Sequence, residues 1–318
     1  MWRSNLPPGL AIQARKAALR FGSLFVLVPM AAYGKLGCRG DTGIMKDKGT
    51  EFRLLHEEPG AFIIPNPWDV GTAKILAALG FRALATTSAG MAFSYGVAEG
   101  QASREETLNH CRTLVSATSL PVSADLEKGF GDSPESSAET IRAAGAIGLA
   151  GCSLEDHTGN PDDPIYDFSL AVERIHAAAK AKSALSHDFM LTARCENFMW
   201  GRPDLDDTIK RLQAFEAAGA DVLYAPGLKD MDTIRIVCES VSKPVNIVMG
   251  LPGATFSVAE LASVGVKRIS VGSALARLAY GAFVNAAREM AADGTFGFTD
   301  RAMGFAELES FFTGMTET

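Results

Sequence analysis

Apolar and polar positions alternate along the chain in blocks, and from Gly60 onward these blocks form a loose internal repeat. In each repeat an Ala-rich segment of helical pattern ends at a glycine, and an apolar run follows shortly afterwards. Glycine adopts the left-handed conformation that closes a helix more readily than residues that carry a Cβ atom. We therefore predict helix, cap and strand at junctions around Gly80, Gly145, Gly219 and Gly265.

Further apolar runs between these junctions predict strands at 62–65, 121–126, 190–194 and 245–249. Near-continuous apolar runs are typical of strands whose two faces are both buried in a parallel sheet. Together with the runs after the glycines they make eight strands in strict alternation with helices, which predicts a (β/α)8 TIM-type barrel. A flavodoxin-like or Rossmann sheet is the alternative, but no GxGxxG motif follows an early strand.

The two ends of the chain depart from the repeat. At 1–44, basic residues precede an apolar stretch at 21–32 that loosely resembles an export signal, but Pro29 interrupts it and it is too short to span a bilayer. We expect this segment to be an extension outside the fold, with Met45 as the true start. Since 47% of the 318 residues are apolar, we expect one barrel domain at 45–318.

The tail after Thr299 carries another short helical pattern with four large apolar side chains, Phe305, Leu308, Phe311 and Phe312. We expect an additional C-terminal helix there. Such an apolar face requires a surface to cover it, and the surface belongs either to another subunit or to the chain's own barrel.

Composition narrows the class of partner. The net charge is −7 and no long basic stretch is present, so a small molecule is favoured over nucleic acid, which needs clustered Lys and Arg. No segment predicts a membrane partner. The five cysteines are scattered without CxxC spacing, which indicates neither disulfides nor zinc and suits a reducing cytoplasm. Cys152 and Cys195 flank acidic motifs and are more typical of small core residues than of nucleophiles.

Barrel enzymes carry their reactive groups at the carboxyl ends of the strands. Asp125 and Glu127 end the third predicted strand at alternate positions, which predicts that both face the same way. The fourth predicted strand ends with Glu155 and Asp156, and the fifth ends with Arg194 and Glu196. Carboxylates crowded into a poorly solvated barrel mouth repel one another strongly unless a cation lies between them.

A hard divalent cation is the simplest partner for this acidic cluster. Mg²⁺, with Mn²⁺ as an alternative, prefers oxygen ligands and is held by one or two carboxylates together with waters and substrate oxygens. Arg194 offers a rigid fork for a substrate carboxylate. The alternative is that these residues form ordinary ion pairs or helix caps, and this interpretation applies most readily to Asp156.

Other residues near these motifs have competing interpretations. Lys128 is either a Schiff-base lysine or a solvated loop residue, and His157 is either a proton shuttle or an ordinary turn histidine. Gly272 and Ser273 precede the last major helix, where they would cradle a phosphate or allow tight helix packing.

The segments TTSAGMAFSYGVAEG, DLEKGFGD, LEDH, ARCENFMWGRPDLDDTI and PVNIV occur in this order along the chain. From about Phe52 to its end the chain thereby resembles the isocitrate lyase and phosphoenolpyruvate mutase superfamily. The resemblance implies a Mg²⁺-dependent barrel that acts on 2-oxo or 2-hydroxy carboxylates. It also implies a homodimer or homotetramer that exchanges its C-terminal helix.

The resemblance assigns roles to particular residues. Asp125 would contact the metal directly, and Glu99, Glu127 and Glu155 would hold its waters. The substrate would be bound by Thr87, Ser88, Ala89, Arg194 and Asn246, the first three through their backbone amides. Catalysis would then rest on Arg194, Asp125 and Glu155.

The loop after the fourth acidic motif departs from the family. Lyases of the family carry a catalytic cysteine in a lysine-rich loop there, whereas this chain reads HTGNPDDPIYD. Phosphonate-processing members carry a Lys-and-Asn gating motif, and here only Asn160 is present, in a different setting. Cleavage of isocitrate or methylisocitrate is therefore not expected, and phosphonate chemistry is weakened.

These observations favour a Mg²⁺-dependent lyase that cleaves a C–C bond next to the carboxylate of a small 2-oxo or 2-hydroxy acid, for example by decarboxylating an oxaloacetate-like acid. The alternatives are P–C bond chemistry of the phosphonopyruvate hydrolase or phosphoenolpyruvate mutase type, a Schiff-base aldolase that uses Lys128, and a non-catalytic barrel that binds a carboxylate.

Overall fold

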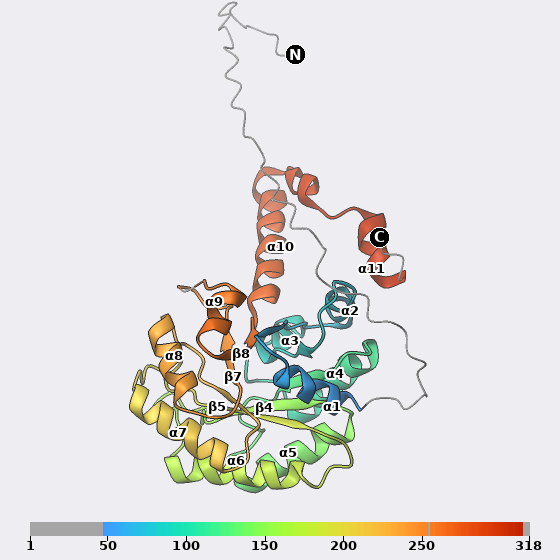
Figure 1. Ribbon diagram of the computed structural model, residues 1–318. Helices are drawn as coiled ribbons and strands as arrows, with labels where there is room; N and C mark the ends of the chain where they lie inside the picture. The colour runs from blue at the N-terminus through green and yellow to red at the C-terminus, as the bar shows by residue number, and fades with distance from the viewer. Residues whose placement is uncertain (1–46, 254, 314–318) are drawn as a thin grey trace, which may run out of the picture. The chain divides into compact units, whose positions relative to one another are not determined.

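Figure 1 shows the computed structural model, which describes residues 47–253 and 255–313. The expected extension at 1–44 and the expected start at Met45 lie outside these residues. The described strands are β1 Phe62–Ile64, β2 Leu84–Ala85, β3 Val122–Asp125, β4 Gly151–Glu155, β5 Met190–Arg194, β6 Val222–Tyr224, β7 Val245–Val248 and β8 Val266–Ser270. The helices up to β8 are α1 Lys48–Glu57, α2 Val70–Ala78, α3 Ser88–Ser94, α4 Arg104–Ala117, α5 Pro134–Ala146, α6 Phe168–Lys182, α7 Leu205–Ala217, α8 Met231–Glu239 and α9 Val258–Ser263.

The eight described strands form one parallel sheet in the order β1-β8-β7-β6-β5-β4-β3-β2. Between the ends of this series, the Ala85 backbone N–H donates to the Pro65 carbonyl over 3.0 Å, so the sheet curves into a nearly closed barrel. Helices alternate with the strands, which confirms the predicted (β/α)8 TIM-type fold. The Rossmann-type alternative is wrong, because an open sheet would not bring its first strand beside its last.

The predicted glycine caps are confirmed at Gly80, Gly219 and Gly265, whose φ angles are 85°, 106° and 95°. The prediction for Gly145 is wrong, because this residue lies inside α5 and the left-handed residue is Gly148, with φ 82°. A Cβ atom on Gly145 would lie 2.6 Å from a Leu185 methyl carbon. Glycine at 145 thus lets α5 pack closely against Leu185, and the helix closes at the next glycine.

Helix α1 closes the amino end of the barrel. Its Phe52 and Leu55 are buried in a cluster that includes Met190 and Val222, the first residues of β5 and β6. The Arg53 guanidinium donates to both carboxylate oxygens of Asp188 over 2.6 Å, which fastens α1 beside the start of β5. Because α1 covers the amino ends of the strands, the barrel interior is approached from their carboxyl ends.

After β8 the chain continues into α10 Ala274–Asp293, the 3-10 helix η1 Gly297–Arg301 and α11 Phe305–Thr313. The expected C-terminal helix is thus confirmed as α11, which contacts α2 (Figure 1). Large apolar side chains on this region are exposed, among them Leu278, Phe283, Phe296, Phe305 and Phe312. None of the helices within the described residues combines the length and the hydropathy that a membrane crossing requires.

Candidate active site

A cavity of about 60 Å³ lies inside the barrel toward the carboxyl ends of the strands. Its walls are rich in hydroxyl, amide and charged side chains, and the residues that matter below are Thr87, Asp125, Arg194, Tyr224, Asn246, Arg268 and Ser270. Most barrel interiors of this fold are filled by branched apolar side chains. The polar lining therefore marks this cavity as the candidate active site.

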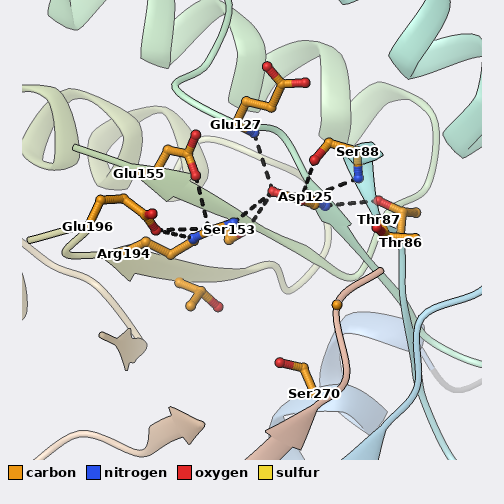
Figure 2. Close-up of polar contacts among 12 residues, drawn as sticks. Thr86, Thr87, Ser88, Asp125, Glu127, Ser153, Glu155, Arg194, Glu196 and Ser270 are labelled. Carbon is orange, nitrogen blue, oxygen red and sulfur yellow. Dashed lines mark hydrogen bonds and ion pairs between the residues drawn. The ribbon is translucent and has the colours of Figure 1, made fainter. Parts of the chain in front are cut away.

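Asp125, the last residue of β3, is held from several sides (Figure 2). Its Oδ2 accepts from the Ser88 hydroxyl over 2.8 Å and from the Ser88 backbone N–H over 3.3 Å. Its Oδ1 accepts from Arg194 Nη1 over 3.1 Å. The Asp125 backbone N–H donates to Thr86 Oγ1 over 2.9 Å, so the main chain is fixed as well. The predicted metal ligand is thus a preorganised carboxylate in the cavity wall.

Arg194, at the end of β5, joins three carboxylates. Besides Asp125, its Nη2 lies 3.1 Å from Glu155 Oε2, and its Nε donates to Glu196 Oε1 over 2.8 Å. Its guanidinium carbon also lies 5.1 Å from the centroid of the Tyr224 ring. The structure therefore places the residue predicted to bind substrate inside the acidic cluster itself.

Glu196 has no role among the sequence-predicted site residues, although it stands two positions after Arg194 in the TARCEN segment. In the structure only 2% of its surface is exposed, and its carboxylate orients the guanidinium. The Glu196 backbone N–H donates to Asp156 Oδ1 over 2.8 Å, and Asp156 pairs with Arg211 over 3.1 Å. Asp156 is thus part of a buried structural ion pair, as its alternative interpretation held.

Glu127 is placed differently from the prediction. Strand β3 ends at Asp125, and Glu127 has φ 48°, so alternation along a strand does not set its direction. The cause is a turn in which the Gly129 N–H donates to the Leu126 carbonyl over 2.8 Å, with the Leu126 side chain fully buried. The Glu127 carbonyl accepts from the Glu155 N–H over 3.0 Å, which ties the two acidic segments together.

The acidic cluster is electrostatically crowded. Burial, followed by repulsion from Asp125 and Glu99, raises the pKa of Glu127 to about 7. Burial is also the first cause that raises the pKa of Glu155 well above its usual range, and burial with Asp125 raises that of Glu99. Burial opposes ionisation of Arg194, but Glu196, Glu155 and Asp125 raise its pKa. The positive charge of Arg194 is therefore too small to balance all the carboxylates around it.

This donor set fits a hard divalent cation, because it consists of crowded carboxylate oxygens with raised pKa values. Within the described residues, no three His, Cys, Asp or Glu side chains converge as the direct ligands of one metal would. Mg²⁺ does not require such convergence, since it usually keeps several waters and takes one or two carboxylates. Of the four predicted metal residues, Asp125 lines the cavity, and Glu99, Glu127 and Glu155 interact with it electrostatically.

The residues expected to bind a substrate carboxylate lie beside this cluster. Thr87 is the N-cap of α3 and accepts from the Gly90 N–H over 3.2 Å, while the Ser88 N–H is directed at Asp125. Ala89 follows in the same buried turn. Across the barrel, Asn246 Nδ2 donates to Ser270 Oγ over 3.1 Å and lines the cavity. Of the predicted substrate and metal residues, Thr87, Asp125, Arg194 and Asn246 line the cavity, while Ser88 contacts Asp125 and Glu155 contacts Arg194.

The remaining candidates have structural partners. Lys128 Nζ lies 2.7 Å from Asp132 Oδ1 and donates to the Thr158 carbonyl, outside the residues that line the cavity. This geometry gives the Schiff-base alternative no support. The His157 ring stacks on Trp200 with centroids 3.8 Å apart.

The glycine and cysteine candidates are also accounted for. The backbone N–H of Gly272 donates to Asn66 Oδ1 over 2.9 Å, as does that of Val271, so the Gly272 donor of the candidate phosphate cradle already has a partner. Cys152 and Cys195 are fully buried, and burial raises the pKa of both thiols. They are core residues, as the sequence favoured.

Comparison with known proteins gives consistent matches. The family model described as phosphoenolpyruvate phosphomutase matches residues 52–291. An uncharacterized protein of Mycobacterium tuberculosis is 30% identical over 261 residues, which cover 81% of this chain and 95% of that protein. A 2-methylisocitrate lyase of Shewanella oneidensis is 31% identical over 215 residues, which cover 63% of this chain and 72% of the lyase.

Two further matches bear on chemistry and fold. An oxaloacetate decarboxylase of Rhodopseudomonas palustris is 28% identical over 171 residues, which cover 52% of this chain and 57% of the decarboxylase. A crystal structure from Burkholderia cenocepacia J2315, named as a candidate lyase/mutase, is 56% identical with a TM-score of 0.82. That match covers 85% of this chain and 96% of the crystallised chain.

Proposed function

Because the chain belongs to the phosphoenolpyruvate mutase family, within the phosphoenolpyruvate mutase/isocitrate lyase superfamily, we propose that it is a Mg²⁺-dependent lyase of small 2-oxo acids. The reaction cleaves a C–C bond next to the substrate carboxylate, and decarboxylation of an oxaloacetate-like acid is the simplest case. The observation that carries the proposal is the contact of Arg194 with Asp125 inside a crowded acidic cluster, because it joins an anion-binding group to a cation-binding group in one cavity.

The residues would divide the work as follows. Asp125 would hold Mg²⁺ directly, and Glu99, Glu127 and Glu155 would hold its waters. When bound, Mg²⁺ supplies Lewis acidity toward the carboxylate and keto oxygens of a 2-oxo acid. Mn²⁺ has the same preference for oxygen ligands and would serve as a substitute.

Arg194 and the groups around it act on the charge that the reaction creates. When CO2 leaves, the electron pair of the broken C–C bond remains on the fragment that keeps the 2-oxo group, and a proton is taken up afterwards. Arg194 and the Ser88 segment would stabilise this negative charge, which is absent from the ground state, so they should affect turnover as well as binding. The side chains of Arg194 and Asp125 are largely buried, which strengthens these interactions.

The loop after β4 supports decarboxylation over cleavage of a larger 2-hydroxy acid. Residues 157–167 contain no cysteine that could serve as an acid or base, and loss of CO2 needs no general base to begin. The His157 ring in this loop is instead packed against Trp200.

The test is a panel of 2-oxo diacids and 2-hydroxy diacids assayed with Mg²⁺ and then with EDTA. We expect CO2 release from at least one 2-oxo diacid, its loss with EDTA, and its return with Mg²⁺ or Mn²⁺. Undiminished turnover in EDTA would refute the metal-dependent mechanism. Phosphate release from phosphonopyruvate, without C–C cleavage of any acid, would establish the P–C alternative instead.

We also propose that the protein forms a homodimer or homotetramer through its C-terminal region, and that the subunits exchange this region. The exposed apolar side chains of α10, η1 and α11 support this, because such a surface is costly in a monomer. Light scattering of the full chain tests the proposal, and a purely monomeric species would refute it.

A further inference from the structure

Arg268 projects from β8 into the barrel interior and lines the same cavity as Asp125 and Arg194. Its Nη2 donates to Thr192 Oγ1 over 2.9 Å, and Thr192 stands two residues before Arg194 on β5. Because alternate residues of a strand share a face, the Arg268 guanidinium lies one layer closer to the amino end of the barrel than Arg194. The cavity therefore has a second cation at its floor.

The other contacts of Arg268 are with neutral groups. Its Nε donates to Asn246 Oδ1 over 2.8 Å, and its Nη1 lies 3.5 Å from His56 Nε2. The His56 Nδ1 lies 2.8 Å from the Phe52 carbonyl, which can only accept, so Nδ1 carries the proton and Nε2 accepts from Arg268. Burial lowers the pKa of His56 to about 3, so this ring carries no charge at neutral pH.

No carboxylate among the described residues lies within ion-pairing distance of Arg268, although only 5% of its surface is exposed. Burial lowers its pKa to about 10, so it stays protonated at neutral pH. An isolated buried charge is costly, and apolar side chains such as Met190 and Val222 fill the layer below it. Packing alone therefore does not explain an arginine at this position.

Arg268 also has donors to spare. A guanidinium carries five N–H groups, and the contacts with Asn246, Thr192 and His56 use three of them, which leaves two. Ser270 and the Asn246 amide supply further polar groups beside it. A cavity of about 60 Å³ holds roughly four to six water-sized groups, which suits a carboxylate and the atoms that connect it.

We propose that Arg268 is a specificity-determining residue that binds a second anionic group of the ligand, so that the cavity selects small dicarboxylates over monocarboxylates. One carboxylate lies at the Arg194 and Ser88 end of the cavity, and the other lies at the floor with Arg268 and Asn246. This inference rests on the proposed function for the identity of the first group, but the cation at the floor is a property of the barrel itself.

The experiment measures binding, with Mg²⁺ present, of malate and of 2-hydroxybutanoate, two acids that differ by a carboxylate in place of a methyl group. The wild type should bind malate about 10- to 100-fold more tightly, as expected for a charge-assisted contact. Arg268→Met should abolish this ratio while the affinity for 2-hydroxybutanoate changes by less than about twofold. Arg268→Lys should retain part of the ratio.

Arg235→Met is the matched control, because Arg235 is exposed on α8 and pairs with Asp232, and its ratio should equal that of the wild type. Equal binding of the two acids by the wild type, or an equal loss of both in Arg268→Met, would overturn the inference. Should Arg268→Met fail to fold, the wild-type ratio and Arg268→Lys still decide. If the protein decarboxylates a 2-oxo diacid but does not prefer malate, the role of Arg268 is refuted and the proposed function stands. If it prefers malate but turns over no acid, the proposed function is refuted and the role of Arg268 stands.

Discussion

The Arg194 guanidinium lies 3.1 Å from the Asp125 carboxylate, so the cation proposed to bind the substrate and the carboxylate proposed to bind the metal neutralise each other. Both side chains are largely buried, which strengthens their interaction and makes the loss of either partner costly. A metal that binds Asp125 would weaken its pairing with Arg194, and a substrate carboxylate would then replace Asp125 as the partner of Arg194. Conversely, a carboxylate bound to Arg194 would leave Asp125 free to hold the metal. Metal and substrate are therefore expected to bind with positive coupling.

Asp125→Asn tests the metal side of this pair. The amide keeps the shape but loses the charge, so Mg²⁺ affinity should fall by more than about 100-fold, and turnover should fall with it. Calorimetric titration with Mg²⁺ measures the affinity. Asp132→Asn is the control, because Asp132 pairs with Lys128 and is well exposed outside the cavity. Normal Mg²⁺ binding by Asp125→Asn would remove this residue from the proposed site.

Arg194→Met tests the cationic side. The substitution leaves Asp125, Glu155 and Glu196 without their shared cation, and the free energy of unfolding should fall by about 3–5 kcal/mol. Mg²⁺ should restore part of this loss if it binds the same cluster in the folded state only. Urea unfolding with and without Mg²⁺ measures both effects. If Mg²⁺ does not restore any of the lost free energy of unfolding, the metal does not bind at these carboxylates.

The sequence predicted the strands well, because each is a short apolar run whose burial does not depend on particular side-chain contacts. It also located the polar residues at the strand ends, since chain order alone brings those ends together. It failed for Gly145, which lies inside α5 and not at its end, and for Glu127, whose positive φ replaces the strand alternation that was expected to set its direction. Such features depend on neighbours that are distant in sequence or on backbone angles that residue type does not fix.

Arg268 illustrates the same limit within the site. In the segment VKRIS it reads as one of two adjacent basic residues, and nothing in the letters distinguishes it from Lys267. Strand parity separates them, because Lys267 Nζ donates to the Gly60 carbonyl at an exposed position while Arg268 is buried in the barrel. This parity is fixed by the register of β8 with β1 and β7, which the segment's own residues do not determine.

Thiol reagents should leave the enzyme active. Cys111, Cys152 and Cys195 are fully buried, and burial raises the pKa of each thiol, so none presents a thiolate at neutral pH. Incubation of the native protein with iodoacetamide, followed by activity measurement and intact-mass analysis, tests this. Stoichiometric inactivation from which substrate protects would identify a reactive cysteine and favour a lyase mechanism that depends on one.

The buried ring of His56 should make stability depend on pH. Burial, followed by the charge of Arg268, lowers its pKa in the folded protein to about 3, whereas an unfolded histidine titrates near 6.5. Between these values the unfolded chain binds a proton that the folded protein refuses. The free energy of unfolding should therefore fall as the pH is lowered below about 6.5, with a slope from this residue that approaches 1.4 kcal/mol per pH unit.

His56→Gln isolates this contribution, because a glutamine amide can still donate to the Phe52 carbonyl and accept from Arg268 but does not titrate. Other buried histidines, such as His110, remain in both proteins and cancel in the comparison. Urea unfolding between about pH 5 and pH 7 should give the variant the shallower slope. Parallel slopes would mean that the ring gains its proton without unfolding, and that the barrel floor tolerates a second positive charge beside Arg268.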